Sequence, residues 1–144
     1  MLPALNEQGD LPPGVHVASW PEIERRFGSG SSAREGAMAT LKHLHELALR
    51  TGALRAFYVF GSFVSAASTP RDIDLALVMD AGFCLEDCPR ESRTLFSHAD
   101  AEARYRASIF WLREGTLSEQ AMREFLATWQ TKRDGSVRGI LEVV

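Results

Sequence analysis

The chain has 144 residues, a formal net charge of −3 at pH 7, 45% hydrophobic residues and 24% charged residues. This length is typical of one domain with a sufficient core, and the negative charge excludes wholesale electrostatic capture by nucleic acid or by an anionic membrane. No signal peptide and no apolar run near 20 residues is found, so we expect a cytoplasmic chain in which Cys84 and Cys88 stay reduced rather than paired.

The N-terminal sixteen residues contain three prolines and two glycines but no hydrophobic period. This composition predicts an extended arm on the surface over residues 1–18, followed by a single domain over residues 19–144. Ser19 and Glu22 have the spacing of a capping box, so a short helix is predicted to begin there and to end near residues 27–28.

A longer helix is predicted from a second capping box, formed by Ser32 and Glu35, to Gly52. Its apolar residues recur at helical spacing. His43 and His45 lie two positions apart in this helix and therefore point in different directions, so they cannot share a metal ion. We interpret both as solvent-exposed helix residues.

The rest of the chain alternates between strand-like and helix-like segments. The predicted elements are strands over 54–60, 73–79 and 107–112, helices over 86–106 and 118–131, and a last short strand over 137–144. This order predicts an α+β fold with α/β-like alternation, in which helices pack against a small mixed β-sheet.

The first predicted strand ends at Gly61 and Ser62, where the chain turns. Glycine lets a phosphate approach the backbone closely, and backbone N–H groups and the serine hydroxyl can donate hydrogen bonds to it. A Gly-Ser pair alone is a common turn, so this feature indicates a phosphate site only in combination with others.

The second predicted strand begins at Asp72 and Asp74. Side chains at i and i+2 of a strand point to the same face. Two carboxylates placed in this way raise each other's pKa unless a cation lies between them. Magnesium meets that requirement, because it binds through one or two carboxylates together with substrate phosphates.

The combination of a strand, Gly61-Ser62, nine intervening residues and Asp72-Ile73-Asp74 resembles the active-site signature of the nucleotidyltransferase superfamily that includes DNA polymerase beta. In length the chain resembles the minimal nucleotidyltransferases. The pieces "LPPGVH", "FGSFVS", "PRDIDL" and "FLATWQTKRDGSVRGILEV" are also similar to a bacterial family of uncharacterised nucleotidyltransferase-like proteins.

The resemblance implies that Gly61 and Ser62 hold the phosphates of a nucleoside triphosphate, with ATP the favoured substrate. Asp72 and Asp74 would be the catalytic carboxylates and would hold one or two Mg²⁺ ions. Arg71 would contact a phosphate, although a surface turn explains it equally well. The implied reaction moves a nucleoside monophosphate onto a hydroxyl of a protein or RNA and releases pyrophosphate, and some relatives act in toxin–antitoxin systems.

The sequence departs from the superfamily pattern at the third carboxylate, which a later strand usually supplies. The predicted strand over 107–112 contains no Asp or Glu, and the nearest acids are Asp100, Glu102 and Glu114. Three explanations are open. One of these acids reaches the site, one metal ion is enough for the reaction, or the domain has lost its transfer activity. In the last case the domain is a degenerate module that binds a nucleotide or, like an antitoxin, a partner protein, and its oligomeric state stays open.

Overall fold

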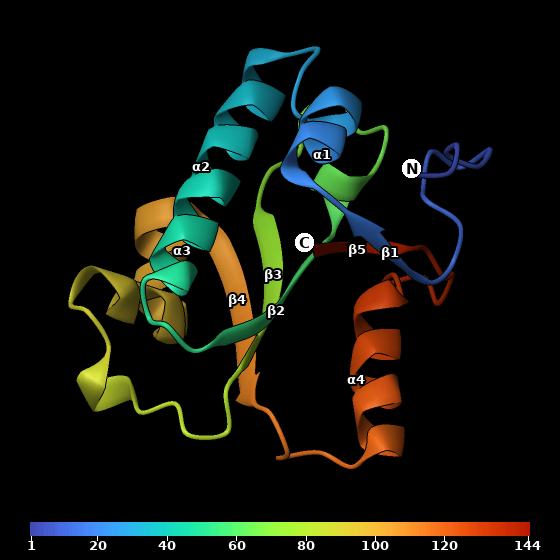
Figure 1. The fold of residues 1–144 in the computed structure, drawn as a ribbon. Coiled ribbons are helices and arrows are strands. Elements are labelled where there is room, and N and C mark those ends of the chain that lie inside the picture. Colours follow the sequence, from blue (N-terminus) through green and yellow to red (C-terminus); the bar gives the residue numbers. More distant parts are fainter.

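The sheet forms where the sequence places its apolar and β-branched runs. In the computed structural model, which describes residues 1–144, its strands are β1 (Val15–Ala18), β2 (Leu54–Phe60), β3 (Ile73–Met79), β4 (Ala107–Arg113) and β5 (Ile140–Val143). The strand order is β1-β5-β2-β3-β4 (Figure 1). β3 pairs antiparallel with β2 and parallel with β4, while β5 pairs antiparallel with β2 and parallel with β1. The sheet is therefore mixed.

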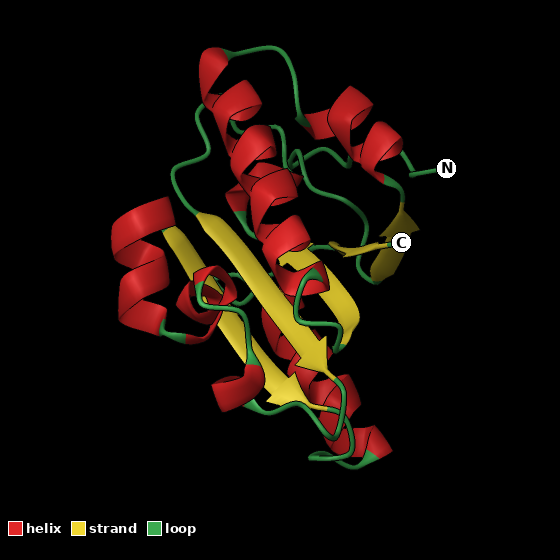
Figure 2. Ribbon diagram, turned by 60° about the vertical axis from the view of Figure 1, so that its left-hand side comes forward, coloured by secondary structure: helices red, strands yellow, loops and turns green.

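Helices cover both faces of this sheet (Figure 2). The α-helices are α1 (Trp20–Phe27), α2 (Ser32–Leu49), α3 (His98–Tyr105) and α4 (Glu119–Gln130), and the 3₁₀ turns are η1 (Ser62–Val64), η2 (Leu85–Asp87) and η3 (Glu91–Phe96). The main core lies between the sheet and α1, α2, η3 and α3, whereas α4 packs alone on the other face. None of these helices combines the length and the apolar character that a membrane span requires.

The observed architecture confirms the predicted α+β fold with a small mixed sheet. The strands predicted over 54–60 and 73–79 have the observed bounds of β2 and β3. The helix predicted over 86–106 is wrong in its first half, which forms η2 and η3. Pro89 restricts the residue before it, and the Ser97 side chain accepts a hydrogen bond from the Asp100 amide, so the α-helix begins only there.

The N-terminal segment differs from the predicted surface arm. Leu2 and Leu11 are buried in the main core, and Asp10 is 4% exposed. Residues Val15–Ala18 form β1, an edge strand of the sheet. The segment has no regular period because its buried residues are separated by turns, and a periodicity search therefore overlooks them.

His45 is not the exposed helix residue that the sequence predicted. Its Nδ1 accepts a hydrogen bond from the indole N–H of Trp20 at 3.1 Å, and its ring lies 4.8 Å from that of Phe57. Burial lowers the pKa of this imidazole. His43 is exposed as predicted.

Arg34, in the first turn of α2, anchors the loop that follows β2. The side chain is buried and donates hydrogen bonds to four carbonyl oxygens, those of Phe27, Phe63, Ser65 and Ala67. Three of these belong to the loop that begins at Gly61. The planar guanidinium is suited to this task because it presents five N–H donors in a fixed geometry.

Replacing Arg34 with Lys is expected to lower the free energy of unfolding by about 1–3 kcal/mol, since an ammonium with three donors leaves at least one buried carbonyl without a partner. Chemical denaturation checks this. Arg50→Lys is the matched control, because Arg50 is exposed and pairs with surface glutamates. Equal stabilities for the two variants would contradict the anchoring role.

Candidate functional site

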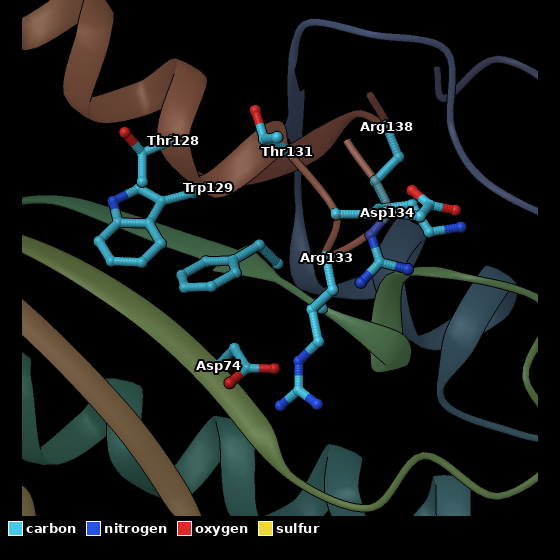
Figure 3. A pocket seen from close by; sticks show the side chains of 10 residues that line it. Asp74, Thr128, Trp129, Thr131, Arg133, Asp134 and Arg138 are labelled. Atoms are coloured by element: carbon cyan, nitrogen blue, oxygen red, sulfur yellow. The ribbon is translucent and has the colours of Figure 1, made fainter. Parts of the chain in front are cut away.

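Asp74 lies on the face of the sheet that α4 covers. On β3 it alternates with residues of the main core, and its neighbours across the strands are Phe60 on β2 and Ser108 on β4. Its side chain lines a cavity of about 550 Å³ between the ends of β2 and β3 and the C-terminal end of α4 (Figure 3). The other lining residues that matter here are Gly61, Trp129, Lys132, Arg133 and Arg138.

Gly61 touches the Asp74 carboxylate and could not carry a side chain. A Cβ atom at this position would lie 2.1 Å from Oδ2 of Asp74. The backbone also has φ +84° and ψ −163°, a conformation that is essentially restricted to glycine. The fold therefore places an aspartate and a glycine in direct contact at the end of β2. Ser62 opens η1 and is half-buried.

Asp72 and Arg71 line a different cavity from Asp74. Asp72 precedes β3, is exposed, and lines a separate cavity of about 520 Å³ with Arg71 and Arg106. Neither Asp72 nor Arg71 lines the Asp74 cavity. The charge of Asp72 nevertheless acts on Asp74, because it contributes to the raised pKa described next.

The pKa of Asp74 is raised to about 6. Burial is the larger cause, since it disfavours the charged form, and the negative charge of Asp72 adds to it. Arg138 and Arg133 act in the opposite direction and favour the carboxylate. Asp74 is thus largely ionised at neutral pH but at a cost, which a bound cation would remove.

Aromatic rings lie on the sheet beside Asp74. Trp129 of α4 stacks on Phe60 with ring centroids 4.7 Å apart, and its ring lies 4.4 Å from that of Phe110 on β4. These three rings cover the sheet beside Asp74, and two of them line its cavity. The indole N–H of Trp129 is buried without a hydrogen-bond partner.

The opposite wall of the cavity is cationic and comes from the turn after α4. Lys132 and Arg138 both pair with Asp10, at 3.1 and 3.4 Å. Arg133 makes no ion pair, is exposed, and extends from this turn toward Asp74 (Figure 3). None of these three residues was predicted from the sequence. Their signal is the basic run "TKRDGSVR", residues 131–138, directly after α4.

None of the three acids singled out in the sequence joins Asp72 and Asp74. Another carboxylate, Asp134, lines the Asp74 cavity from the turn after α4, where it accepts hydrogen bonds from the amide and the hydroxyl of Ser136. Ser108 occupies the position opposite Asp74 on β4. Glu114 lies beyond the far end of that strand, where its amide donates to the Met79 carbonyl, about 17 Å from Asp74 at 3.3 Å per residue. The other two candidate acids, Asp100 and Glu102, lie on α3, which packs on the opposite face of the sheet.

Asp74 and Asp72 are the carboxylates that could hold a cation here. No cluster of three His, Cys, Asp or Glu side chains that could hold a metal occurs in the chain. A single Mg²⁺ needs only one or two carboxylates when phosphate oxygens and water complete its octahedral shell. Asp74, with its raised pKa and its contact with Gly61, is the stronger candidate ligand, and Asp72 is the second.

Comparison with known proteins gives a family but no function. No curated protein and no solved structure matches the chain. A family model described as "Family of unknown function (DUF6932)" matches residues 3–144. Because this match spans nearly the whole sequence, the chain belongs to the family of unknown function DUF6932.

Proposed function

We propose that the chain binds a nucleoside triphosphate, with the phosphates in the Asp74 cavity, as a nucleotidyltransferase-like domain without a complete two-metal centre. The observation that carries the proposal is the contact between Asp74 and Gly61 in a cavity whose other wall presents Lys132, Arg133 and Arg138. One wall suits a cation and the other suits an anion, and a metal-bound triphosphate supplies both charges.

Each part of the cavity has a defined task in this proposal. Asp74, with Asp72 nearby, would hold Mg²⁺, and the ion would neutralise the triphosphate charge. Gly61 leaves the space in which the carboxylate and a phosphate can lie together, because it has no side chain. Arg133 is free of any ion pair, so its guanidinium can bind phosphate oxygens in a bidentate manner.

Transfer of a nucleoside monophosphate to a hydroxyl group is the second candidate function. The spacing of Gly61, Asp72 and Asp74 favours it, since this spacing carries the resemblance to the superfamily. Ser108 at the position opposite Asp74 argues against it, because the lost metal ligand removes several kcal/mol of transition-state charge stabilisation. We therefore rank binding above transfer.

Calorimetry with ATP, GTP, CTP and UTP tests the proposal, each with Mg²⁺ and with a chelator in its place. Binding of at least one triphosphate that weakens without Mg²⁺ is expected. If none binds, the proposed function is wrong. Transfer is tested with triphosphates labelled at the α-phosphate and a cell lysate. Labelled acceptors that disappear with Asp72→Ala/Asp74→Ala would place transfer first.

Replacing Arg133 with Ala is expected to weaken Mg²⁺–ATP binding about tenfold or more, which is the effect of losing one charge-assisted hydrogen-bonded contact. The slope of affinity against salt concentration should also become shallower. Arg123→Ala is the matched control, since Arg123 is an exposed arginine of α4 outside the cavity. Equal affinities for the two variants would remove Arg133 from the site.

A further inference from the structure

The N-terminal segment contacts two cations that line the Asp74 cavity, Lys132 and Arg138, and also the loop that follows Gly61. From these contacts we infer that Asp10 is a positioning residue, which fixes Lys132 and Arg138 and so presets the cationic wall for an anionic ligand. The inference rests on the proposed function, because it concerns how the same cavity receives a triphosphate. It gives the segment before β1 a role in binding that the sequence did not indicate.

Asp10 is placed between two cations from the other end of the chain. Its Oδ2 accepts a hydrogen bond from Nζ of Lys132 at 3.1 Å, and its Oδ1 accepts one from Nη1 of Arg138 at 3.4 Å. The carboxylate is 4% exposed, so water screens these pairs only weakly. Both partners line the cavity, whereas Asp10 does not. Asp10 therefore acts on the ligand through them.

The backbone around Asp10 also holds the loop that follows Gly61. The carbonyl of Gly9 accepts a hydrogen bond from the Ala66 amide at 2.8 Å, and Asp10 forms an isolated β-bridge with Ser65. The loop from Gly61 onward is thus held on one side by Arg34 and on the other by residues 9–10.

The following residues hold the cationic wall. The Gly139 amide donates to the Leu11 carbonyl at 2.8 Å, and Oε1 of Gln130, the last residue of α4, accepts from the Gly14 amide at 2.7 Å. The fit is close, because a Cβ atom on Gly139 would lie 2.2 Å from the carbonyl oxygen of Pro12. Residues 9–14 therefore connect the loop after Gly61 with the end of α4 and with the segment before β5.

These contacts indicate a role in binding as well as in stability. Long cationic side chains lose rotamer freedom when they bind an anion, and a side chain that is already fixed loses less. Asp10 fixes two of the three cations and leaves Arg133 free to close on the ligand. A supporting shell of this kind keeps a site in its productive geometry.

Asp10→Asn separates positioning from simple electrostatics, because the two predict opposite signs. The variant removes a negative charge beside the cavity, so electrostatics alone would strengthen the binding of an anion. Positioning predicts that affinity for Mg²⁺–ATP falls about tenfold, since Lys132 and Arg138 lose their fixed geometry. Calorimetry on the full chain, with circular dichroism to verify folding, measures the sign.

Asp80→Asn is the matched control. It breaks the Arg55–Asp80 pair at the other end of β3, away from the cavity, and should leave ATP affinity unchanged. If the wild type binds Mg²⁺–ATP and Asp10→Asn binds it equally well or more tightly, the positioning role is wrong while the proposed function stands. If the wild type binds none of the four triphosphates, the proposed function fails and this inference fails with it.

A measurement on the wild type covers the case in which Asp10→Asn does not fold. Binding and ordering of the N-terminal segment are coupled reciprocally, so Mg²⁺–ATP should slow hydrogen exchange at the amides of Gly14, Ala66 and Gly139. These amides donate the hydrogen bonds that join residues 9–14 to the loop after Gly61, to the end of α4 and to the segment before β5. Unchanged exchange at all three on saturation with Mg²⁺–ATP would overturn the inference.

Discussion

Gly61→Ala is expected to lower the free energy of unfolding by about 2–6 kcal/mol and to abolish Mg²⁺–ATP binding. Two costs add. A non-glycine residue at φ +84° and ψ −163° is strained by about 1–3 kcal/mol. The new Cβ would also lie 2.1 Å from Oδ2 of Asp74, so the carboxylate must move within a packed site, at a further cost of about 1–3 kcal/mol.

Two further variants divide these costs. Gly52→Ala measures the cost of a positive φ alone, because Gly52 has φ +70° and nothing lies within 4 Å of the added Cβ. It should cost less than Gly61→Ala. In Gly61→Ala/Asp74→Ala the clash with Oδ2 is absent, so the loss should be smaller than the sum of the single variants. Equal stabilities of the two glycine variants, measured by urea denaturation, would contradict the contact between Gly61 and Asp74.

The local elements of this fold could be predicted because their signals are local. β2 and β3 are short runs of apolar and β-branched residues with clear ends, and the Ser19 capping box begins α1 as expected. The predictions failed where tertiary contacts, and not the local sequence, determine the structure. The first half of the segment over 86–106 forms 3₁₀ turns, and there the Ser92 hydroxyl donates a hydrogen bond to the Leu47 carbonyl on α2.

The candidate site could be predicted only in its β2–β3 half. Gly61 and Asp74 lie thirteen residues apart on paired strands, so their meeting follows from a hairpin-like pairing of neighbouring segments. Asp10 and Lys132 lie at opposite ends of the chain and meet only because β1 pairs with β5 in parallel. No motif spacing predicts contacts between residues so far apart in the sequence. The cationic wall could therefore be identified only from the fold.

The surroundings of Asp74 give a physical reason why the sequence makes it a candidate functional residue. A carboxylate beside aromatic rings on a covered face of a sheet is unfavourable in the absence of a ligand, and its pKa is raised to about 6. Residues that lower stability in this way cluster at functional sites, although structural networks produce them too. An experiment distinguishes a functional carboxylate from a structural one. Replacing a functional carboxylate with an uncharged residue should raise stability and weaken ligand binding.

Asp74→Asn is accordingly expected to raise the free energy of unfolding by about 1–2 kcal/mol above pH 7 and to weaken Mg²⁺–ATP binding at least about tenfold. The two units between the ordinary value of 3.8 and about 6 set an upper limit near 3 kcal/mol, which partial exposure of the side chain reduces. The uncharged amide removes the burial cost, and it also removes the anionic ligand for Mg²⁺.

The sign of the pH dependence makes this prediction specific. Between pH 3.8 and about 6 the unfolded chain releases the Asp74 proton while the folded chain keeps it, so wild-type stability falls as pH rises through this window. Thermal denaturation should therefore show no gain in stability for Asp74→Asn near pH 3.8 and a gain that levels off above about pH 6.

Asp72→Asn is the control for this pH dependence. Because Asp72 is exposed, its direct effect on stability should be small, yet removing its charge should lower the Asp74 pKa and move the window to lower pH. A gain in stability that is the same at all pH values would mean that burial does not raise the pKa of Asp74. Asp74 would then be an ordinary acid and not a ligand for a cation.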